Sequence, residues 1–192
     1  MYHLDEVRLK YQNGGDNPKG KKKQKEVDLT PLDLQTMYAN NPIYGDNRYM
    51  DTTLLRNMDN FMIRRNVGYP QRVAMATNVH QEGSKLGSHG NGAYGLVGWR
   101  GSRATPVINT NDSVQFQYLY DTTLGDYDNS HWHHGGKGSG YNTAKEAQQA
   151  FIDADNVEDA TRALTYGYVR PPMTDRKFRL RNVIGLITPN SK

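Results

Sequence analysis

The sequence contains no cysteine, which excludes disulfide bonds and thiolate chemistry and leaves histidine, aspartate and glutamate as the side chains for any zinc site. It contains no apolar run near 18 residues, so we expect no membrane span. The first residues lack the charged-then-apolar layout of a signal peptide. Hydrophobic residues make up only 35% of the 192 residues, whereas nineteen glycines and thirteen tyrosines are present. This composition favours one domain with a modest core, many loops and aromatic rings suited to packing or to stacking on sugars or bases.

The two ends of the chain differ in composition from its middle. Residues 1–45 include a polar, glycine-containing and basic tract at 11–25, and we interpret them as a flexible basic arm. Much of the excess behind the mild net charge of +4 lies in this tract. The arm is either a nucleic-acid contact or a solvated linker, and the linker is the commoner meaning of such a tract. Residues 173–192 lose the helical period after Pro171 and Pro172 and are expected to form an extended tail.

Five helices are predicted between the arm and the tail. Apolar residues at three- and four-residue steps follow Asp51, a plausible N-cap, and a second helix is expected to begin near Pro70 and close at Gly83 with one apolar face. The other predicted helix starts are Asn111, Thr143 in a capping box with Glu146, and Asn156, with the last helix stopping at Gly167. We therefore predict a mainly helical α+β fold, with a glycine-rich loop or small β-hairpin after the second helix.

The stretch from Asn78 to Arg103 is the part of the chain best suited to chemistry. Glu82 ends the second helix and lies one turn after Asn78 and Val79, so it is expected to share their face. The negative end of the helix dipole also lies there. Burial and the dipole both favour a protonated carboxylic acid. General-acid cleavage of an ether-like bond requires a carboxylic acid in that form.

The arrangement resembles the lysozyme superfamily, in which a helix-terminal glutamate precedes a glycine-rich turn and then a segment of the type Gly-Tyr-Gly-x-x-Gln-Trp. The nearest match is the phage tail lysozyme type of domain, with the soluble lytic transglycosylases more distant. The matching segments are Glu82-Gly83, 93–99 and 101–103, and the resemblance covers roughly residues 50–172. Two positions depart from the pattern, because Gly98 replaces the glutamine and Gly83 replaces a common serine.

The resemblance implies a lysozyme-like catalytic domain over residues 46–172. It further implies cleavage of the β-1,4 bond between N-acetylmuramic acid and N-acetylglucosamine in bacterial peptidoglycan, with Glu82 as the catalytic acid and no cofactor. It places the protein in a phage particle, acting on the cell wall during penetration, with contacts to other virion proteins through the N- and C-terminal tails.

A second carboxylate is the open question of this mechanism. The chain has no aspartate or glutamate between Glu82 and Asp112, so a partner must be remote in sequence. Retaining cleavage needs two carboxylates about 5 Å apart, and inverting cleavage about 6.5 to 9.5 Å. The candidates are Asp112, Asp121, Asp126 and Asp128. The alternative, implied by the likeness to lytic transglycosylases, is that Glu82 acts alone, first as acid and then as base.

Aromatic and basic residues supply the candidate substrate contacts. Stacking on sugar rings is predicted for Tyr94, Trp99, Trp132 and Tyr141, and hydrogen bonding to hydroxyls or the lactyl group for Arg103. Packing in the fold is the alternative interpretation for each ring.

Three histidines, His131, His133 and His134, lie in a long glycine-rich loop. A helical His-Glu-x-x-His motif is absent from the sequence, so we expect a substrate-facing or solvated loop and no metal. Besides a muramidase, the sequence leaves open a non-catalytic virion structural or glycan-binding module, and, less favoured, a zinc amidase.

Overall fold

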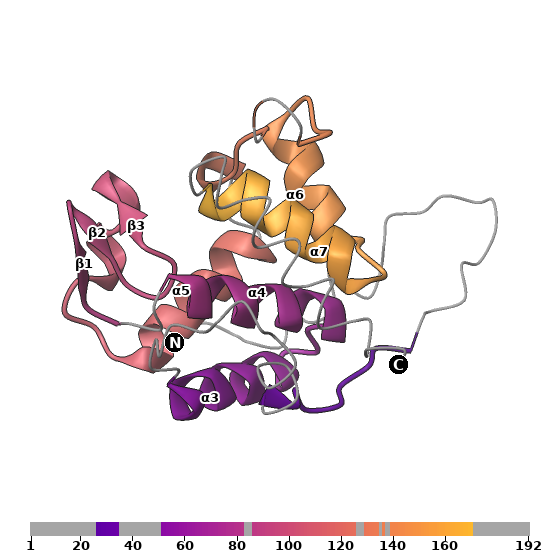
Figure 1. Cartoon of the computed structure of the whole chain (residues 1–192), viewed down its shortest axis with the longest axis horizontal. Coiled ribbons are helices and arrows are strands. Elements are labelled where there is room, and N and C mark those ends of the chain that lie inside the picture. The colour runs from indigo at the N-terminus through magenta and orange to yellow at the C-terminus, as the bar shows by residue number, and fades with distance from the viewer. Residues whose placement is uncertain are drawn as a thin grey trace, which may run out of the picture.

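The computed structural model describes residues 26–34, 51–82, 86–125, 129–134, 136 and 139–170. Within these residues the helices and strands follow one another along the chain as shown in Figure 1. They are α3 (Thr52–Ile63), α4 (Tyr69–Gln81), β1 (Ser88–Gly90), β2 (Ala93–Tyr94), β3 (Trp99–Arg100), α5 (Asp112–Thr123), α6 (Ala144–Ile152), α7 (Val157–Ala163) and the π-helical segment η5 (Leu164–Val169), with short 3₁₀ turns η2 (Gly101–Arg103), η3 (Thr105–Val107) and η4 (Asn129–His131). The predicted fold class, mainly helical with a small antiparallel sheet after the second helix, is confirmed.

The helix starts follow the capping chemistry of the sequence. The side chains of Asp51, Asn111, Thr143 and Asn156 each accept the backbone N–H three residues further on, at 2.9 to 3.1 Å. Each cap satisfies one of the amide groups that the first helical turn leaves without a partner. The four predicted N-caps are confirmed. At α6 the reciprocal contact differs by one residue, because Glu146 accepts from the amide of Asn142.

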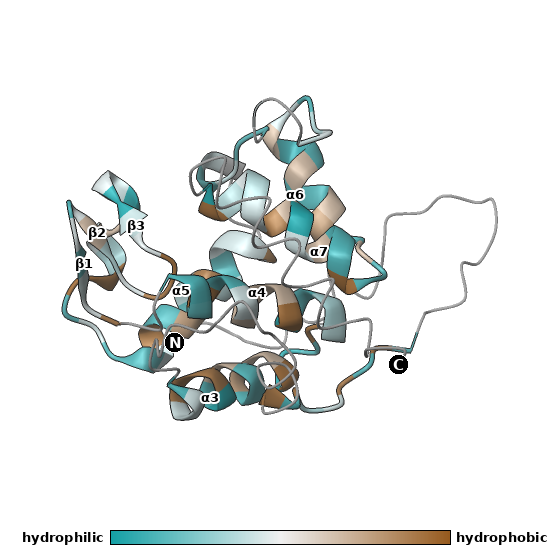
Figure 2. Cartoon of the chain, in the orientation of Figure 1, coloured by the Kyte–Doolittle hydropathy of each residue, from teal (hydrophilic) through white to brown (hydrophobic). Residues whose placement is uncertain are grey.

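Helix α4 occupies the centre of the molecule. It lies between α3 and α7 (Figure 1), and every residue from Gln71 to His80 is buried. Figure 2 shows hydrophilic as well as hydrophobic residues along it. The single apolar face predicted for this helix is therefore wrong. Two of its buried polar side chains donate hydrogen bonds to main-chain carbonyls: Gln71 donates to Phe151 O and Ala154 O at 3.0 Å, and Asn78 donates to Ala74 O at 3.0 Å.

The segment 26–34 packs on the helical body. Leu32 and Leu34 join the hydrophobic core, and the amide of Leu32 donates to Asp59 Oδ2 at 2.9 Å. Asp59 forms an ion pair with Arg72, whose side chain is fully buried. Arg72 Nη2 also donates to the carbonyls of Asp28 and Thr30, at 3.0 and 2.8 Å. Residues 26–34 of the predicted arm therefore pack on the helical body, and the rest of the range 1–45 lies outside the described residues.

The last helical stretch continues past Gly167, where we predicted a stop. It runs as the π-helical segment η5 to Val169 and ends at Arg170, which adopts the left-handed conformation. A Cβ at Gly167 would lie 2.8 Å from the Cβ of Ala147 and 2.9 Å from the ring of Trp132. This glycine therefore serves close packing and does not end the helix. The predicted tail, 173–192, lies outside the described residues.

The strands form one antiparallel sheet of order β1-β2-β3 at one end of the molecule (Figure 1). Ala93 pairs with Arg100 and Tyr94 pairs with Trp99. In the part of the chain that the structure describes, no helix combines the length and the apolar character required to cross a membrane.

Candidate functional site

Glu82 lies where the central helix meets the sheet. It is the C-cap of α4, its amide donates to Asn78 O at 3.0 Å, and its side chain is half-buried. Its carboxylate faces Gly98, since a Cβ built at Gly98 would lie 3.1 Å from Glu82 Oε2. The structure therefore brings the predicted catalytic residue against the glycine that replaces the glutamine of the lysozyme pattern.

The pairing of β2 with β3 defines which side chains share the face that Glu82 covers. A Cβ at Gly98 would lie 3.9 Å from the Cβ of Ala93, and Ala93 pairs with Arg100. Directly paired residues in a sheet project to the same face, and their chain neighbours project to the other. Ala93 and Arg100 thus lie on the Glu82 face. Arg100 is not among the predicted site residues, because only the strand register places it there.

Tyr94 and Trp99, the neighbouring pair, project to the opposite face, toward α5. The Trp99 ring meets that of Tyr118 on α5 at 5.2 Å between centroids, and the Tyr94 hydroxyl donates to Asn109 Oδ1 at 3.1 Å. Two predicted substrate contacts are therefore separated from the Glu82 carboxylate by the sheet itself.

Gln115 on α5 fixes the glycine-rich turn between β2 and β3. Its side chain is fully buried, its Oε1 accepts from the amide of Leu96 at 3.1 Å, and its Nε2 donates to Leu86 O at 2.8 Å. A Cβ at Gly95, where φ is +76°, would lie 2.8 Å from the same Oε1. Gln115 is not among the predicted site residues. The sequence carries one sign of its role: Gln115 lies one helical turn before Leu119, so a polar amide stands on the apolar stripe of the predicted helix.

Both tryptophans belong to the core. Trp99 and Trp132 are 1% and 4% exposed. Trp99 Nε1 donates to the hydroxyl of Tyr168 at 2.9 Å, and Trp132 Nε1 donates to Thr122 O at 3.0 Å. The Tyr168 and Thr122 hydroxyls also bond one another at 2.6 Å. Neither indole leaves a ring face for a sugar, so the packing interpretation describes both residues, and Tyr168 is the polar centre that sequence reasoning missed.

Arg103 and Tyr141 are half-buried at separate places. The guanidinium of Arg103 lies 4.9 Å from the ring centroid of Tyr168, and its Nη2 donates to Tyr168 O at 3.3 Å. Tyr141 packs against the core, and burial raises the pKa of its phenol despite the opposing charge of Arg162. Arg103 ends η2, the turn that follows β3, whereas Tyr141 precedes α6.

The remote carboxylates have local roles. Asp112 lies in the first turn of α5, where it accepts from the amide of Ser113 at 2.7 Å. Asp121 accepts from Gln117 Nε2 at 2.7 Å, and Gln117 in turn accepts from Arg65 beyond the end of α3. Burial raises the pKa of Asp121, while the Gln117 hydrogen bond and Arg65 oppose this. Asp126 and Asp128 lie outside the described residues.

The histidines do not converge on one point. His131 is buried and its Nε2 lies 2.6 Å from the hydroxyl of Tyr118, while His133 and His134 are exposed and stack at 4.1 Å between centroids. Among the described residues, no group of three or more histidine, aspartate or glutamate side chains is placed to hold a metal ion.

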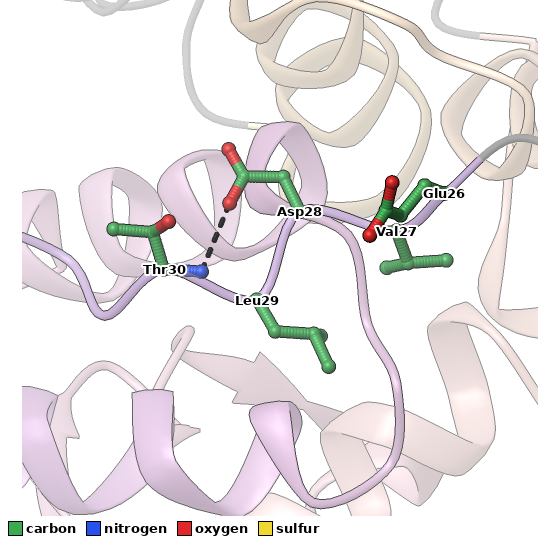
Figure 3. Close-up of a pocket in the computed structure, with 5 residues that line it drawn as sticks. All are labelled: Glu26, Val27, Asp28, Leu29 and Thr30. Atoms are coloured by element: carbon green, nitrogen blue, oxygen red, sulfur yellow. Dashed lines mark hydrogen bonds between the residues drawn. The ribbon is translucent and has the colours of Figure 1, made fainter.

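A hollow lies elsewhere, on the docked N-terminal segment. Glu26, Val27, Asp28, Leu29 and Thr30 line it, and the amide of Thr30 donates to Asp28 at 2.9 Å (Figure 3). This segment contacts Arg72, ten residues before Glu82, which corresponds to about 15 Å along the helix axis. The hollow is therefore not part of the Glu82 site.

Comparison of the chain with protein-family models, curated proteins and solved structures gave no match.

Proposed function

We propose that this protein is a muramidase that cleaves the β-1,4 bond between N-acetylmuramic acid and N-acetylglucosamine, carried by a phage particle and acting on the bacterial cell wall during penetration. The observation that carries the proposal is the position of Glu82. A half-buried carboxyl group ends the central helix and lies over the turn before β3, next to a glycine that leaves the backbone open. A general acid in a glycosidase requires such a positioned, partly desolvated carboxyl group.

The local roles of Asp112 and Asp121 favour a mechanism that uses Glu82 alone. Asp112 binds the start of its own helix and Asp121 lies in a hydrogen-bonded chain that leads to α3. Glu82 would protonate the glycosidic oxygen as the bond to the leaving sugar breaks. The resulting carboxylate would then remove the proton from the attacking nucleophile, which is the C6 hydroxyl of the same muramic acid or water.

The test is the variant Glu82→Gln, which keeps the shape of the side chain but cannot transfer a proton as a carboxyl group does. We expect solubilisation of purified peptidoglycan to fall by about a hundredfold or more, the contribution of a positioned general acid. The matched control is Glu158→Gln, the same change at a helical glutamate whose side chain is 44% exposed and forms an ion pair with Arg162. Equal activity of Glu82→Gln and Glu158→Gln would exclude Glu82 as the acid.

Mass spectrometry of the released fragments identifies the nucleophile. Attack by the C6 hydroxyl leaves a 1,6-anhydro end, whereas attack by water leaves a reducing end. The single-glutamate mechanism predicts anhydro ends as the main product. Reducing ends throughout would show that water attacks and would call for a second group to activate it.

A second candidate is a non-catalytic virion structural or glycan-binding module. Gly98 favours it, because the glutamine of the lysozyme pattern is absent beside Glu82. This candidate predicts that wild-type protein sediments with intact sacculi and releases no soluble fragments. Release of fragments by wild-type protein but not by Glu82→Gln would exclude it.

A further inference from the structure

Arg100 is a cation on the sheet face that Glu82 covers. It pairs with Ala93, whose Cβ lies beside the position that a Gly98 Cβ would occupy, and that position is 3.1 Å from the Glu82 carboxylate. Arg100 is exposed to solvent. Among the described residues, neither an ion pair nor a hydrogen bond engages its guanidinium. The neighbouring Arg103, by contrast, is half-buried and held by Tyr168.

We propose that Arg100 is a specificity-determining residue that binds a carboxylate carried by the glycan, beside the bond over which Glu82 lies. The inference rests on the proposed function for the identity of the glycan. An arginine presents a planar fork of N–H donors that matches a carboxylate in a bidentate contact. In peptidoglycan, muramic acid carries such groups on its lactyl branch, either as the lactyl carboxylate itself or on the stem peptide. A chitin strand has the same β-1,4 amino-sugar backbone and neither group.

The placement of Arg100 gives the contact a direction. Gly98 lies in the turn before β3 and Arg100 follows it by two residues, so their Cα atoms are no more than about 7 Å apart, and an extended arginine spans the neighbourhood of one sugar ring. The acid and the cation then recognise different parts of the same muramic acid. Glu82 meets the glycosidic oxygen, and Arg100 meets the acidic branch.

The binding experiment separates this inference from catalysis. Protein carrying Glu82→Gln is titrated calorimetrically with three ligands of equal length: peptide-free peptidoglycan strands, strands that keep their stem peptides, and N-acetylated chito-oligosaccharides. Adding Arg100→Ala is expected to weaken binding of a carboxylate-bearing strand about tenfold, as for loss of a charged hydrogen bond, and to change chito-oligosaccharide binding less than about twofold. If only peptide-bearing strands lose affinity, the carboxylate is on the peptide. If only peptide-free strands lose affinity, it is the free lactyl group, which becomes an amide when the stem peptide is attached.

Two further variants distinguish recognition from structure. Arg100→Lys keeps the charge and is expected to retain part of the preference, and Arg56→Ala, at an exposed position on α3, is expected to retain all of it. The proposal is overturned if Arg100→Ala keeps the wild-type preference, if it weakens acidic and neutral ligands equally, or if the parent protein binds none of the three. Arg100-dependent binding together with inactive wild-type protein would refute the muramidase and leave the carboxylate site standing.

Discussion

Replacing Gly98 with alanine tests whether the carboxylate of Glu82 must lie where the structure places it. At Gly98, φ is +64°, so any L-residue there adopts the left-handed conformation at a cost of about 1 to 2 kcal/mol in the free energy of unfolding. The new Cβ would also lie 3.1 Å from Glu82 Oε2, closer than ordinary contact, so the carboxylate must move by a few tenths of an ångström. A carboxylate at the end of a flexible side chain can move at small further cost in stability, but it leaves its position.

Gly92 provides a matched control. Its φ is +72°, yet a Cβ there would meet no atom within 4 Å. Gly92→Ala therefore carries the same backbone strain without the contact to Glu82. We expect urea unfolding to show similar losses for Gly92→Ala and Gly98→Ala, within about 0.5 kcal/mol, because both arise from positive φ.

The two variants should differ in activity per folded molecule. Displacement of a catalytic group by a fraction of an ångström to one ångström reduces rates by up to about a hundredfold, so we expect Gly98→Ala to solubilise peptidoglycan about tenfold or more slowly than Gly92→Ala. Turbidity clearance at a temperature where both variants are folded provides the measurement. Equal rates for the two variants would refute the reasoning that this contact positions Glu82.

Three further predictions concern stability. Arg72→Met should lower the free energy of unfolding by about 3 to 5 kcal/mol, because it leaves Asp59 charged and buried, and Arg56→Met at an exposed site should leave the urea midpoint unchanged. Gln115→Met should cost about 2 kcal/mol, since the Leu96 amide loses its buried partner, and amide hydrogen exchange should localise the loosening to the turn before β3; unchanged protection there would contradict this. Burial raises the pKa of Asp121 in the folded state. Between the unfolded and the folded pKa, the folded state therefore holds more protons than the unfolded chain. The contribution of Asp121 to stability falls as pH rises through that window. Asp121→Asn should therefore stabilise the protein at neutral pH, by an amount that disappears below the ordinary aspartate pKa. An equal gain in the urea midpoint at neutral pH and below that pKa would contradict a raised pKa for Asp121.

Local chemistry made the helix starts predictable. Asp51, Asn111, Thr143 and Asn156 cap helices because a short polar side chain before an apolar repeat satisfies the first amides without tertiary help. The end of the second helix was also predictable from a local signal, because the chain changes there from a helical pattern to glycine. Glu82 could thus be placed at a helix end from sequence alone.

Contacts between distant segments decided what could not be predicted. Trp99 is a core residue because Tyr168, 69 positions later, accepts its indole N–H. Arg100 shares a face with Glu82 only through the register that pairs it with Ala93. Period-two alternation within two-residue strands is too short to be detected in the sequence, so neither which side of the sheet a residue faces nor what lies opposite could be derived before the fold was known.

The buried cation of α4 also decides where the protein can be shortened. Arg72 Nη2 donates to the main-chain carbonyls of residues 28 and 30, so the contact depends on the presence of that stretch of backbone more than on its side chains. A truncated protein that starts at residue 46, the boundary suggested by composition, would remove both acceptors and leave a charged group in the interior with unmet donors. The smallest unit for expression should therefore begin at or before Glu26, and substitutions within 26–30 should be tolerated where deletion of the segment is not.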